Sequence, residues 1–536
     1  MTEAKRAFLR EATGLVREAG AIDLLTLASL NISWGLSAMW LILWGPYYGP
    51  GGDLAQSVVI TTALMFFGSL AWAFLASIMP RSGGDFIFNS RALHPLLGFL
   101  SSFGWVCVNF MWCGILGAYV ADPALSLMFS TLGYDAAAQF VSSSWGIFTV
   151  TTVVIWGETL ILMFGLKPML RFQLVMFAFG ILMFLLVWAL MGSVTHEQFV
   201  AGWNAVSARY GSGDYQTIID STSAYLKESY GIVAAPSFAS TMAILPVAFW
   251  GLGYPYLASY LAGETKKVHR SVLIGVPGAL ILCAIFWLIT IWTIQSKVGY
   301  EFLLSVSYAY GDGLEVYALP FPPMFHLFPL VITDNVLLIF LLGWGFVCWN
   351  LIYPAYSILP QARIGLAWAI DRLAPPFFAD IHPRFRTPIK SMILFAIGGE
   401  IIAVIYAFYG YLLAGFTVMI PQILTTFMLS AISAIVIPYR KKMKAIYKAS
   451  PVSKYKIGPL PLISVCGFIY FCFLATVLYY YFTNPALGAR PELGTISFYL
   501  PIAIFVFAIV YFFAIRAYRK KQGVDIDLAF KELPPE

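Results

Sequence analysis

Residues 245–270 form an apolar stretch that is interrupted near its middle and ends in a basic segment. The interruption consists of Gly251, Gly253 and Pro255. A helix in lipid must satisfy its own backbone hydrogen bonds, so these residues predict a break whose freed groups face protein, water or a ligand. Freed carbonyls would bind an ammonium group, and aromatic faces would bind a cation. The alternative is a proline kink repaired by neighbouring helices. The candidate residues are Trp250, Gly251, Leu252, Gly253 and Tyr254.

A second polar interruption lies in the first apolar run, at residues 31–37. A break at residues 33–37 would expose backbone N–H groups at the start of a half-helix, where the positive end of the helix dipole favours a carboxylate. The alternative is that small residues here only allow close helix packing. The candidate residues are Ser33, Trp34, Gly35, Leu36 and Ser37.

Polar side chains at other mid-span positions are candidates for carrying a proton or for contacting a solute. Glu158 and Glu400 are carboxylates at mid-depth, where an ionisable group is costly, so either could carry a proton. A protonated glutamate bonded to a neighbouring helix is the competing interpretation. Asn109 and Asn350 lie where a solute pocket is expected, or they join helices. The five histidines lie in loops or at helix ends and form no metal-ligand cluster, so we expect neither a metal nor a cofactor.

The composition places these residues in an integral membrane protein. Of 536 residues, 60% are hydrophobic and only 11% are charged, against about 25% charged in ordinary soluble domains. At roughly 20 apolar residues per crossing, the sequence predicts an all-α protein with about twelve transmembrane helices. The predicted spans are 22–44, 55–79, 97–121, 147–165, 172–194, 239–262, 272–294, 335–358, 391–410, 412–437, 459–482 and 496–515.

The basic residues predict the orientation of these spans. With both termini in the cytoplasm, 28 of the 32 Lys and Arg residues lie on the inner side, as the positive-inside rule requires. The net charge of +6 is therefore topogenic, and we expect no nucleic-acid partner. Basic residues at inner helix ends follow from topology alone, so acidic partners carry the information about a cytoplasmic gate. The gate candidates are Arg81, Asp85, Glu264, Lys266, Arg363 and Asp371.

The two interruptions lie five spans apart, and an odd number inverts the second half of the chain. Paired interruptions in inverted halves indicate a secondary transporter with a mid-membrane site. The predicted organisation follows from this pairing. It consists of a cytoplasmic N-terminus at 1–21, a first five-helix repeat at 22–194, an inverted repeat at 239–437, two additional helices at 459–515 and a cytoplasmic tail at 516–536.

Four segments resemble the cytoplasmic motifs of the amino acid–polyamine–organocation (APC) permeases. They are residues 79–93 (MPRSGGDF followed by SRAL), 262–270 (AGETK and Arg270), 362–388 (AR, AIDRLAP and HPRFRTP) and 456–463 (KIGPLPLI). The resemblance spans about residues 10–520. It implies the leucine-transporter fold, a 5+5 inverted repeat whose first and sixth helices are unwound. It also places Gly180 where some proton-coupled members carry a lysine.

We therefore expect a multi-pass permease of the cell membrane that moves an amino acid or related small amine by alternating access, with a proton as a candidate coupling ion and membrane lipid around it. A polyamine or organic-cation transporter or exchanger is the first alternative. A channel or a membrane-embedded enzyme is disfavoured, because no repeated pore loop, Gly-x-Ser-x-Gly or paired metal-ligand motif appears.

Overall fold

The computed structural model describes residues 17–410, 420–487, 496–531 and 533. Most of the predicted N-terminal segment 1–21, the start of the predicted span 412–437, part of the predicted tail 516–536 and Arg490 lie outside the described residues. The described part is mainly helical, and its two short strands, β1 (Lys456–Ile457) and β2 (Leu460–Pro461), form one antiparallel pair.

The main helices that fall in the predicted spans are α2 (Ala21–Ile32), α3 (Trp34–Tyr48), α4 (Leu54–Ile78), α6 (Pro95–Tyr119), α9 (Ser144–Met163), α10 (Leu166–Gly192), α14 (Leu245–Leu252), α16 (Val268–Val298), α18 (Val336–Leu351), α19 (Tyr353–Ile370), α20 (Ile389–Tyr409), α21 (Ile420–Val436), α23 (Leu462–Thr483) and α24 (Ile496–Lys521). Each predicted span contains one or two of these helices, although α14 covers only part of the predicted span 239–262 and α19 extends twelve residues beyond the predicted end at 358.

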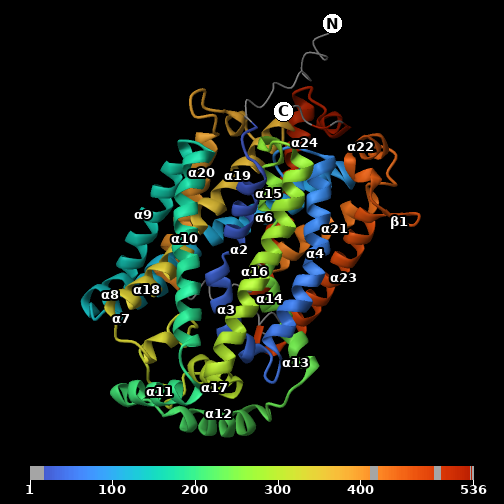
Figure 1. Cartoon of the computed structure of the whole chain (residues 1–536). Coiled ribbons are helices and arrows are strands. Elements are labelled where there is room, and N and C mark those ends of the chain that lie inside the picture. Colours follow the sequence, from blue (N-terminus) through green and yellow to red (C-terminus); the bar gives the residue numbers. More distant parts are fainter. Residues whose placement is uncertain (1–16, 411–419, 488–495, 532, 534–536) are drawn as a thin grey trace.

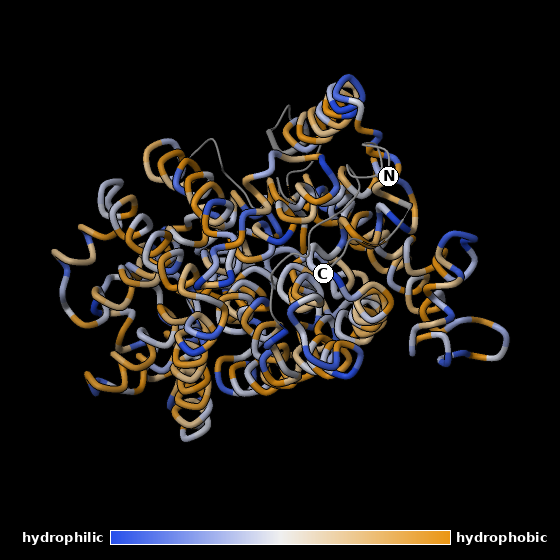
Figure 2. Tube along the Cα trace, turned by 90° about the horizontal axis from the view of Figure 1, so that it is seen from above, coloured by the Kyte–Doolittle hydropathy of each residue, from blue (hydrophilic) through white to orange (hydrophobic). Residues whose placement is uncertain are grey.

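Ten helical segments in the described residues are long and apolar enough to cross a membrane. Two shorter apolar helices, Phe238–Leu252 and Gln422–Val436, fall in the two remaining predicted spans. The chain is thus a multi-pass membrane protein, while the count of twelve crossings stays a prediction. Figure 2 shows hydrophobic residues along the helices at the rim of the bundle. Exposed side chains such as Trp292 on α16 and Val510 on α24 belong to this rim and suit contact with lipid.

The helices form one bundle with two distinct ends (Figure 1). We call the end of the bundle at which α24 finishes the terminal end. Toward it lie α5 (Asp85–Ala92), α15 (Leu257–Tyr260), α22 (Lys444–Ala449) and the C-terminal part of α24. The opposite end carries α11 (His196–Tyr210), α12 (Tyr215–Tyr230), α13 (Phe238–Ala243) and α17 (Tyr300–Gly311). Between the ends, α16 packs against α2 and α4, and α10 packs against α18.

Polar side chains cap the N-termini of two helices at the opposite end. Thr195 caps α11 in a capping box with Gln198, and the Asp214 carboxylate accepts the Thr217 N–H at 2.8 Å to begin α12. Of the two long segments between predicted spans, 195–238 contains α11 and α12, and 295–334 contains α17.

The described residues after α24 include a segment that packs against the bundle. A 3₁₀ helix, η10 (Ile526–Lys531), follows α24, and its Ile526 and Phe530 are buried. The Phe530 ring lies 5.0 Å from the Arg91 guanidinium on α5. Apolar residues inside a polar tail drive this docking, because burying them removes their surface from water.

Candidate functional site

A single residue separates the two halves of the first span. Ser33 adopts a left-handed conformation (φ 46°, ψ 72°) between α2 and α3. Its neighbours Trp34 to Ser37 form the first turn of α3, so the break is narrower than predicted. The Ser37 hydroxyl donates to the Ile32 carbonyl at 2.7 Å and satisfies one group at the end of α2. The N-terminus of α3 thus begins within the span, as an anion site requires.

The second break lies at residues 253–256, between α14 and α15. Trp250, Gly251 and Leu252 remain helical, so the break starts two residues later than the first glycine suggests. The Gly253 N–H still bonds the Phe249 carbonyl at 2.8 Å, which closes the last turn of α14. The C-terminal end of α14 therefore points its last carbonyls into the break.

The helices α3 and α14 contact each other close to their breaks. A Cβ added to Gly251 would lie 2.9 Å from the Ser37 Cβ and 2.3 Å from the Trp287 ring. The Trp287 Nε1–H donates to the Trp34 carbonyl at 3.0 Å. The glycine at position 251 therefore permits close approach of α3, α14 and α16. This arrangement brings the start of one half-helix beside the end of another.

An aromatic cluster surrounds the second break. The Tyr254 ring meets the Trp112 ring edge-on at 4.9 Å, and the Trp105 ring lies 6.5 Å from Tyr254. The Tyr254 hydroxyl and the indole N–H groups of Trp105 and Trp112 are buried and have no hydrogen-bond partner within the described part of the chain. Buried polar groups are nearly always hydrogen-bonded, so this cluster is suited to a polar solute.

The helical hydrogen-bond pattern of the eighth span is interrupted at Ile352, between α18 and α19, which the sequence did not predict, while the Ile352 backbone stays helical (φ −78°, ψ −28°). Glu158 on α9 reaches this interruption, and its Oε2 accepts the Ala355 N–H at 2.8 Å. The carboxylate is 3% exposed and its Oε1 has no partner among the described residues. Glu158 thus bonds the backbone next to Pro354, and this proline was the available sign of the interruption in the sequence.

Trp349 fills the space between the first and fifth predicted spans. A Cβ added to Gly35 would lie 2.1 Å from the Trp349 ring, and one added to Gly180 would lie 2.4 Å from it. The Trp349 carbonyl accepts the Ser33 hydroxyl at 3.3 Å, and the Tyr353 hydroxyl lies close to the hydroxyls of Ser33 and Ser37. The indole therefore occupies the region that the resemblance assigns to a lysine in some relatives.

The other predicted polar residues each have a hydrogen-bond partner. Glu400 on α20 accepts the Thr152 hydroxyl of α9 at 2.5 Å, as the helix-joining interpretation expects. The Asn109 and Asn350 amides donate within their own helices, to Trp105 at 2.7 Å and to Phe346 at 2.9 Å. These amide groups thus satisfy backbone carbonyls rather than bridging helices.

At the terminal end, Arg363 on α19 binds Glu264 of the 3₁₀ helix η2 (Ala262–Glu264) through two parallel bonds of 2.9 and 3.0 Å. The side chains are 1% and 6% exposed. The Glu264 carbonyl accepts the backbone N–H groups of Glu18 and Ala19, so the segment before α2 covers the pair. A buried bidentate pair of this kind fixes α19 against the chain that follows α15.

The remaining gate candidates have different partners. Asp371 pairs with Arg91 at 2.6 Å, and Arg91 was absent from the predicted set. Asp85 accepts the hydroxyls of Ser101 and Tyr260, both at 2.6 Å, instead of pairing with a cation. Burial raises the pKa of the Asp85 carboxyl to about 6, and these two hydrogen bonds oppose the rise.

Two predicted gate residues join neither pair. Lys266 is exposed, and its backbone N–H bonds the Ala19 carbonyl at 2.8 Å. Arg81 donates to the Pro80 carbonyl at 3.0 Å. In the described residues, no group of three or more His, Cys, Asp or Glu side chains is arranged to hold a metal ion.

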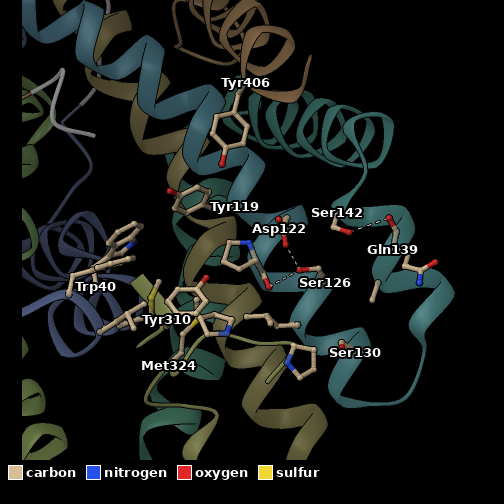
Figure 3. Close-up of a pocket in the computed structure, with 18 residues that line it drawn as sticks. Trp40, Tyr119, Asp122, Ser126, Ser130, Gln139, Ser142, Tyr310, Met324 and Tyr406 are labelled. Atoms are coloured by element: carbon tan, nitrogen blue, oxygen red, sulfur yellow. Dashed lines mark hydrogen bonds between the residues drawn. The ribbon is translucent and has the colours of Figure 1, made fainter. Parts of the chain in front are cut away.

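The opposite end holds a cavity of about 470 Å³. Asp122 lies in it, with Trp40, Tyr119 and Tyr310 on one side and Ser126, Gln139 and Ser142 on the other (Figure 3). The Ser126 hydroxyl donates to Asp122 Oδ1. Asp122 lies one residue beyond the predicted span 97–121, within the π-helix η1 (Val120–Leu125) that separates α6 from α7 (Ser126–Thr131).

Comparison with known proteins identifies a family whose model matches this chain. A family model described as amino acid permease matches residues 42–507. The vacuolar cationic amino acid transporter 4 of Arabidopsis thaliana is 30% identical over 166 residues, which cover 30% of this chain and only 24% of that relative. The branched-chain amino acid permease BcaP of Bacillus subtilis (strain 168) is 23% identical over 388 residues, which cover 70% of this chain and 71% of that relative.

Proposed function

Because the chain belongs to the amino acid permease family, we propose that it is a secondary active transporter that moves an amino acid or a related small amine across the cytoplasmic membrane by alternating access. Family membership confirms the resemblance to the APC permeases and the prediction that the chain is not an enzyme. The proposal includes twelve crossings in a 5+5 inverted repeat, with both termini and the terminal end in the cytoplasm.

The observation that carries the proposal is the juxtaposition of the two breaks. The start of α3 at Trp34 offers N–H groups and the positive end of a helix dipole to a carboxylate. The end of α14 at Leu252 offers carbonyls to an ammonium group. Opposite helix ends held side by side suit a zwitterion, and the polar groups of Trp112 and Tyr254 supply further contacts for its side chain.

The buried pairs of the terminal end act as the cytoplasmic gate in this proposal. Glu264 bound to Arg363 and Asp371 bound to Arg91 hold this end closed. The cavity near Asp122 leaves the opposite end accessible. Alternating access then consists of breaking the two pairs while the opposite end closes.

Glu158 is the proposed proton carrier, since its carboxyl group bonds the backbone of the eighth span at the interruption between α18 and α19. Its Oε2 accepts the Ala355 N–H, a contact that a carboxylate makes more strongly than a carboxylic acid. Binding and release of a proton would therefore change the strength of that contact. Glu400, bonded to Thr152, is the second candidate.

Uptake into proteoliposomes, measured with and without a pH gradient, tests the function. Leucine, arginine and putrescine are suitable solutes, because the two relatives are named for branched-chain and for cationic amino acids. Saturable uptake of an amino acid is expected. Transport of putrescine alone would contradict the amino acid assignment, and uptake that does not saturate at millimolar concentration would indicate a channel.

The carboxylates and the site are tested by variants in the same assay. Glu158→Gln is expected to abolish the dependence on the pH gradient, and an unchanged dependence in both Glu158→Gln and Glu400→Gln would remove proton coupling at these residues. Tyr254→Phe is expected to raise KM several-fold without changing thermal stability, because its hydroxyl bonds no described residue. Tyr447→Phe, which removes another buried hydroxyl at the terminal end, is the matched control.

A further inference from the structure

The cavity around Asp122 combines one negative charge with a wall of aromatic rings. Asp122 is the single charged side chain among the described residues that line it. Its aromatic lining consists of Trp40, Trp44, Tyr119, Tyr310 and Tyr406. A volume of about 470 Å³ lies within the range of sites that hold small organic ligands.

The aromatic rings form a continuous wall. Trp40 stacks on Tyr119 at 6.3 Å and on Trp44 at 6.0 Å. Tyr119 contacts Tyr406 at 6.4 Å, and Trp44 contacts Tyr310 at 6.3 Å. These residues come from α3, α6, α17 and α20, so the wall is built by four separate helices. Such rings attract cations through their faces, and the attraction grows where water is excluded.

The Asp122 carboxylate is held in the cavity by a neighbouring hydroxyl. The Asp122 backbone is non-helical (φ −138°, ψ 116°) within the π-helical turn η1, and the Ser126 hydroxyl binds its Oδ1. Tyr119, Tyr310 and Tyr406 are near enough to interact electrostatically with the Asp122 carboxylate. A carboxylate beside aromatic faces is complementary to an ammonium or guanidinium group and repels an anion.

The cavity is distinct from the paired breaks and adjoins them. Trp40 lines the cavity and meets Trp250 of α14 edge-on at 5.8 Å. Trp40 lies seven positions after Ser33, which is roughly 10 Å along α3. Gln139 and Ser142 at the other side of the cavity are exposed, so the cavity reaches the surface.

We propose that the cavity around Asp122 is a binding site for an organic cation, an ammonium or guanidinium group, which is held there before the solute passes Trp40 and Trp250. The passage inward rests on the proposed transport function, whereas cation binding does not. A molecule of equal size without a net positive charge is attracted less by Asp122 and binds more weakly.

The test measures binding without transport. Ser142→Cys places a thiol at the cavity, in a background with Cys107→Ala and Cys472→Ser because the other four cysteines are buried. The purified protein in detergent is labelled with a polar maleimide in the presence of agmatine, arginine or citrulline. Citrulline keeps the α-ammonium and α-carboxylate groups of arginine but has a neutral urea in place of the guanidinium, so it carries no net positive charge.

Agmatine and arginine are expected to slow the labelling, and citrulline much less. Asp122→Asn should raise the concentration needed for protection about tenfold, which is the loss of one charge-assisted contact. Asp135→Asn removes an exposed charge at the same end and should leave protection unchanged. Gln139→Cys serves as a second reporter at the cavity.

Equal protection by citrulline would overturn the proposal. So would an Asp122→Asn variant that loses thermal stability but keeps full protection, because Asp122 would then only stabilise the start of α7. Protection by agmatine in a protein that takes up no solute in proteoliposomes would support the cation site and refute the transport function. The two failures are therefore distinguishable.

Discussion

The two ends of the bundle differ in how their charged side chains are paired. At the terminal end, oppositely charged side chains are buried and joined to each other, as Arg363 is to Glu264. At the opposite end, the charge of Asp122 lies in a cavity with aromatic rings and hydroxyls around it. A buried ion pair binds nothing further, whereas a carboxylate in a cavity can exchange partners. The difference indicates a conformation closed at one end and accessible at the other.

The largest effect on stability is expected when one member of the buried pair Arg363–Glu264 is removed. Arg363→Met leaves the Glu264 carboxylate buried without its cation and should destabilise the protein by about 3–5 kcal/mol. The melting temperature in detergent measures the effect. The exposed pair Lys390–Asp380 is a matched control, and Lys390→Met should cost less than about 1 kcal/mol.

The double variant Glu264→Gln, Arg363→Met should recover most of that stability, because it leaves no unpaired charge. A double variant as unstable as Arg363→Met would show that packing around α19, and not the ion pair, closes the terminal end.

The second test uses the pH dependence of Asp85. Burial raises its pKa to about 6, above its ordinary value. The neutral form is therefore favoured in the folded protein, and this contribution to stability is complete below about pH 4 and lost as pH rises through 6. The effect is at most about 3 kcal/mol. Asp85→Asn should remove it from melting curves recorded between pH 4 and 7, and exposed Asp380→Asn should not.

A third substitution perturbs the region between the ends. A Cβ at Gly180 would lie 2.4 Å from the Trp349 ring, so Gly180→Ala should destabilise the protein by about 1–3 kcal/mol. Gly192, in the same helix, has open space around it, and Gly192→Ala should be neutral or slightly stabilising. Thermal denaturation compares the two, and adding Trp349→Phe should partly rescue Gly180→Ala.

The smallest expected effect concerns the tail that covers the terminal end. Phe530→Leu keeps an apolar side chain but removes the ring beside Arg91, at a cost of about 0.5–1 kcal/mol. Proteolysis after α24 should become faster. Tyr518, whose exposed ring lies 5.9 Å from the Arg519 guanidinium, supplies the control variant Tyr518→Leu. Equal cleavage rates in both variants would show that the ring does not hold the tail.

Much of the architecture was predictable because lipid imposes length and polarity on each span. The predicted span 55–79 differs from α4 (Leu54–Ile78) by one residue at each end. The break near Pro255 was also predictable, since proline removes a backbone donor. Its position was less so. Gly251 looked like part of the unwound segment, yet it lies in a regular helix and leaves room for the Trp287 ring to pack against that helix. One sequence does not distinguish these two uses of glycine.

The partners of the charged residues were the least predictable feature. Asp371 pairs with Arg91, which lies 280 residues earlier in the chain, and no local pattern reports such a contact. Asp122 was missed for a different reason. It follows directly after an apolar span and precedes Pro123, so it resembled a residue that merely ends a helix.

The helix α12 has a practical consequence for experiments on intact cells. Tyr215 stacks on Phe302 of α17 at 4.3 Å, and the Tyr230 hydroxyl binds Asp312 at 3.0 Å, so both ends of α12 are anchored. Its other face is polar and exposed. An antibody fragment raised against this face would have a rigid epitope. Staining of unpermeabilised cells would then report directly which side of the membrane the helix occupies.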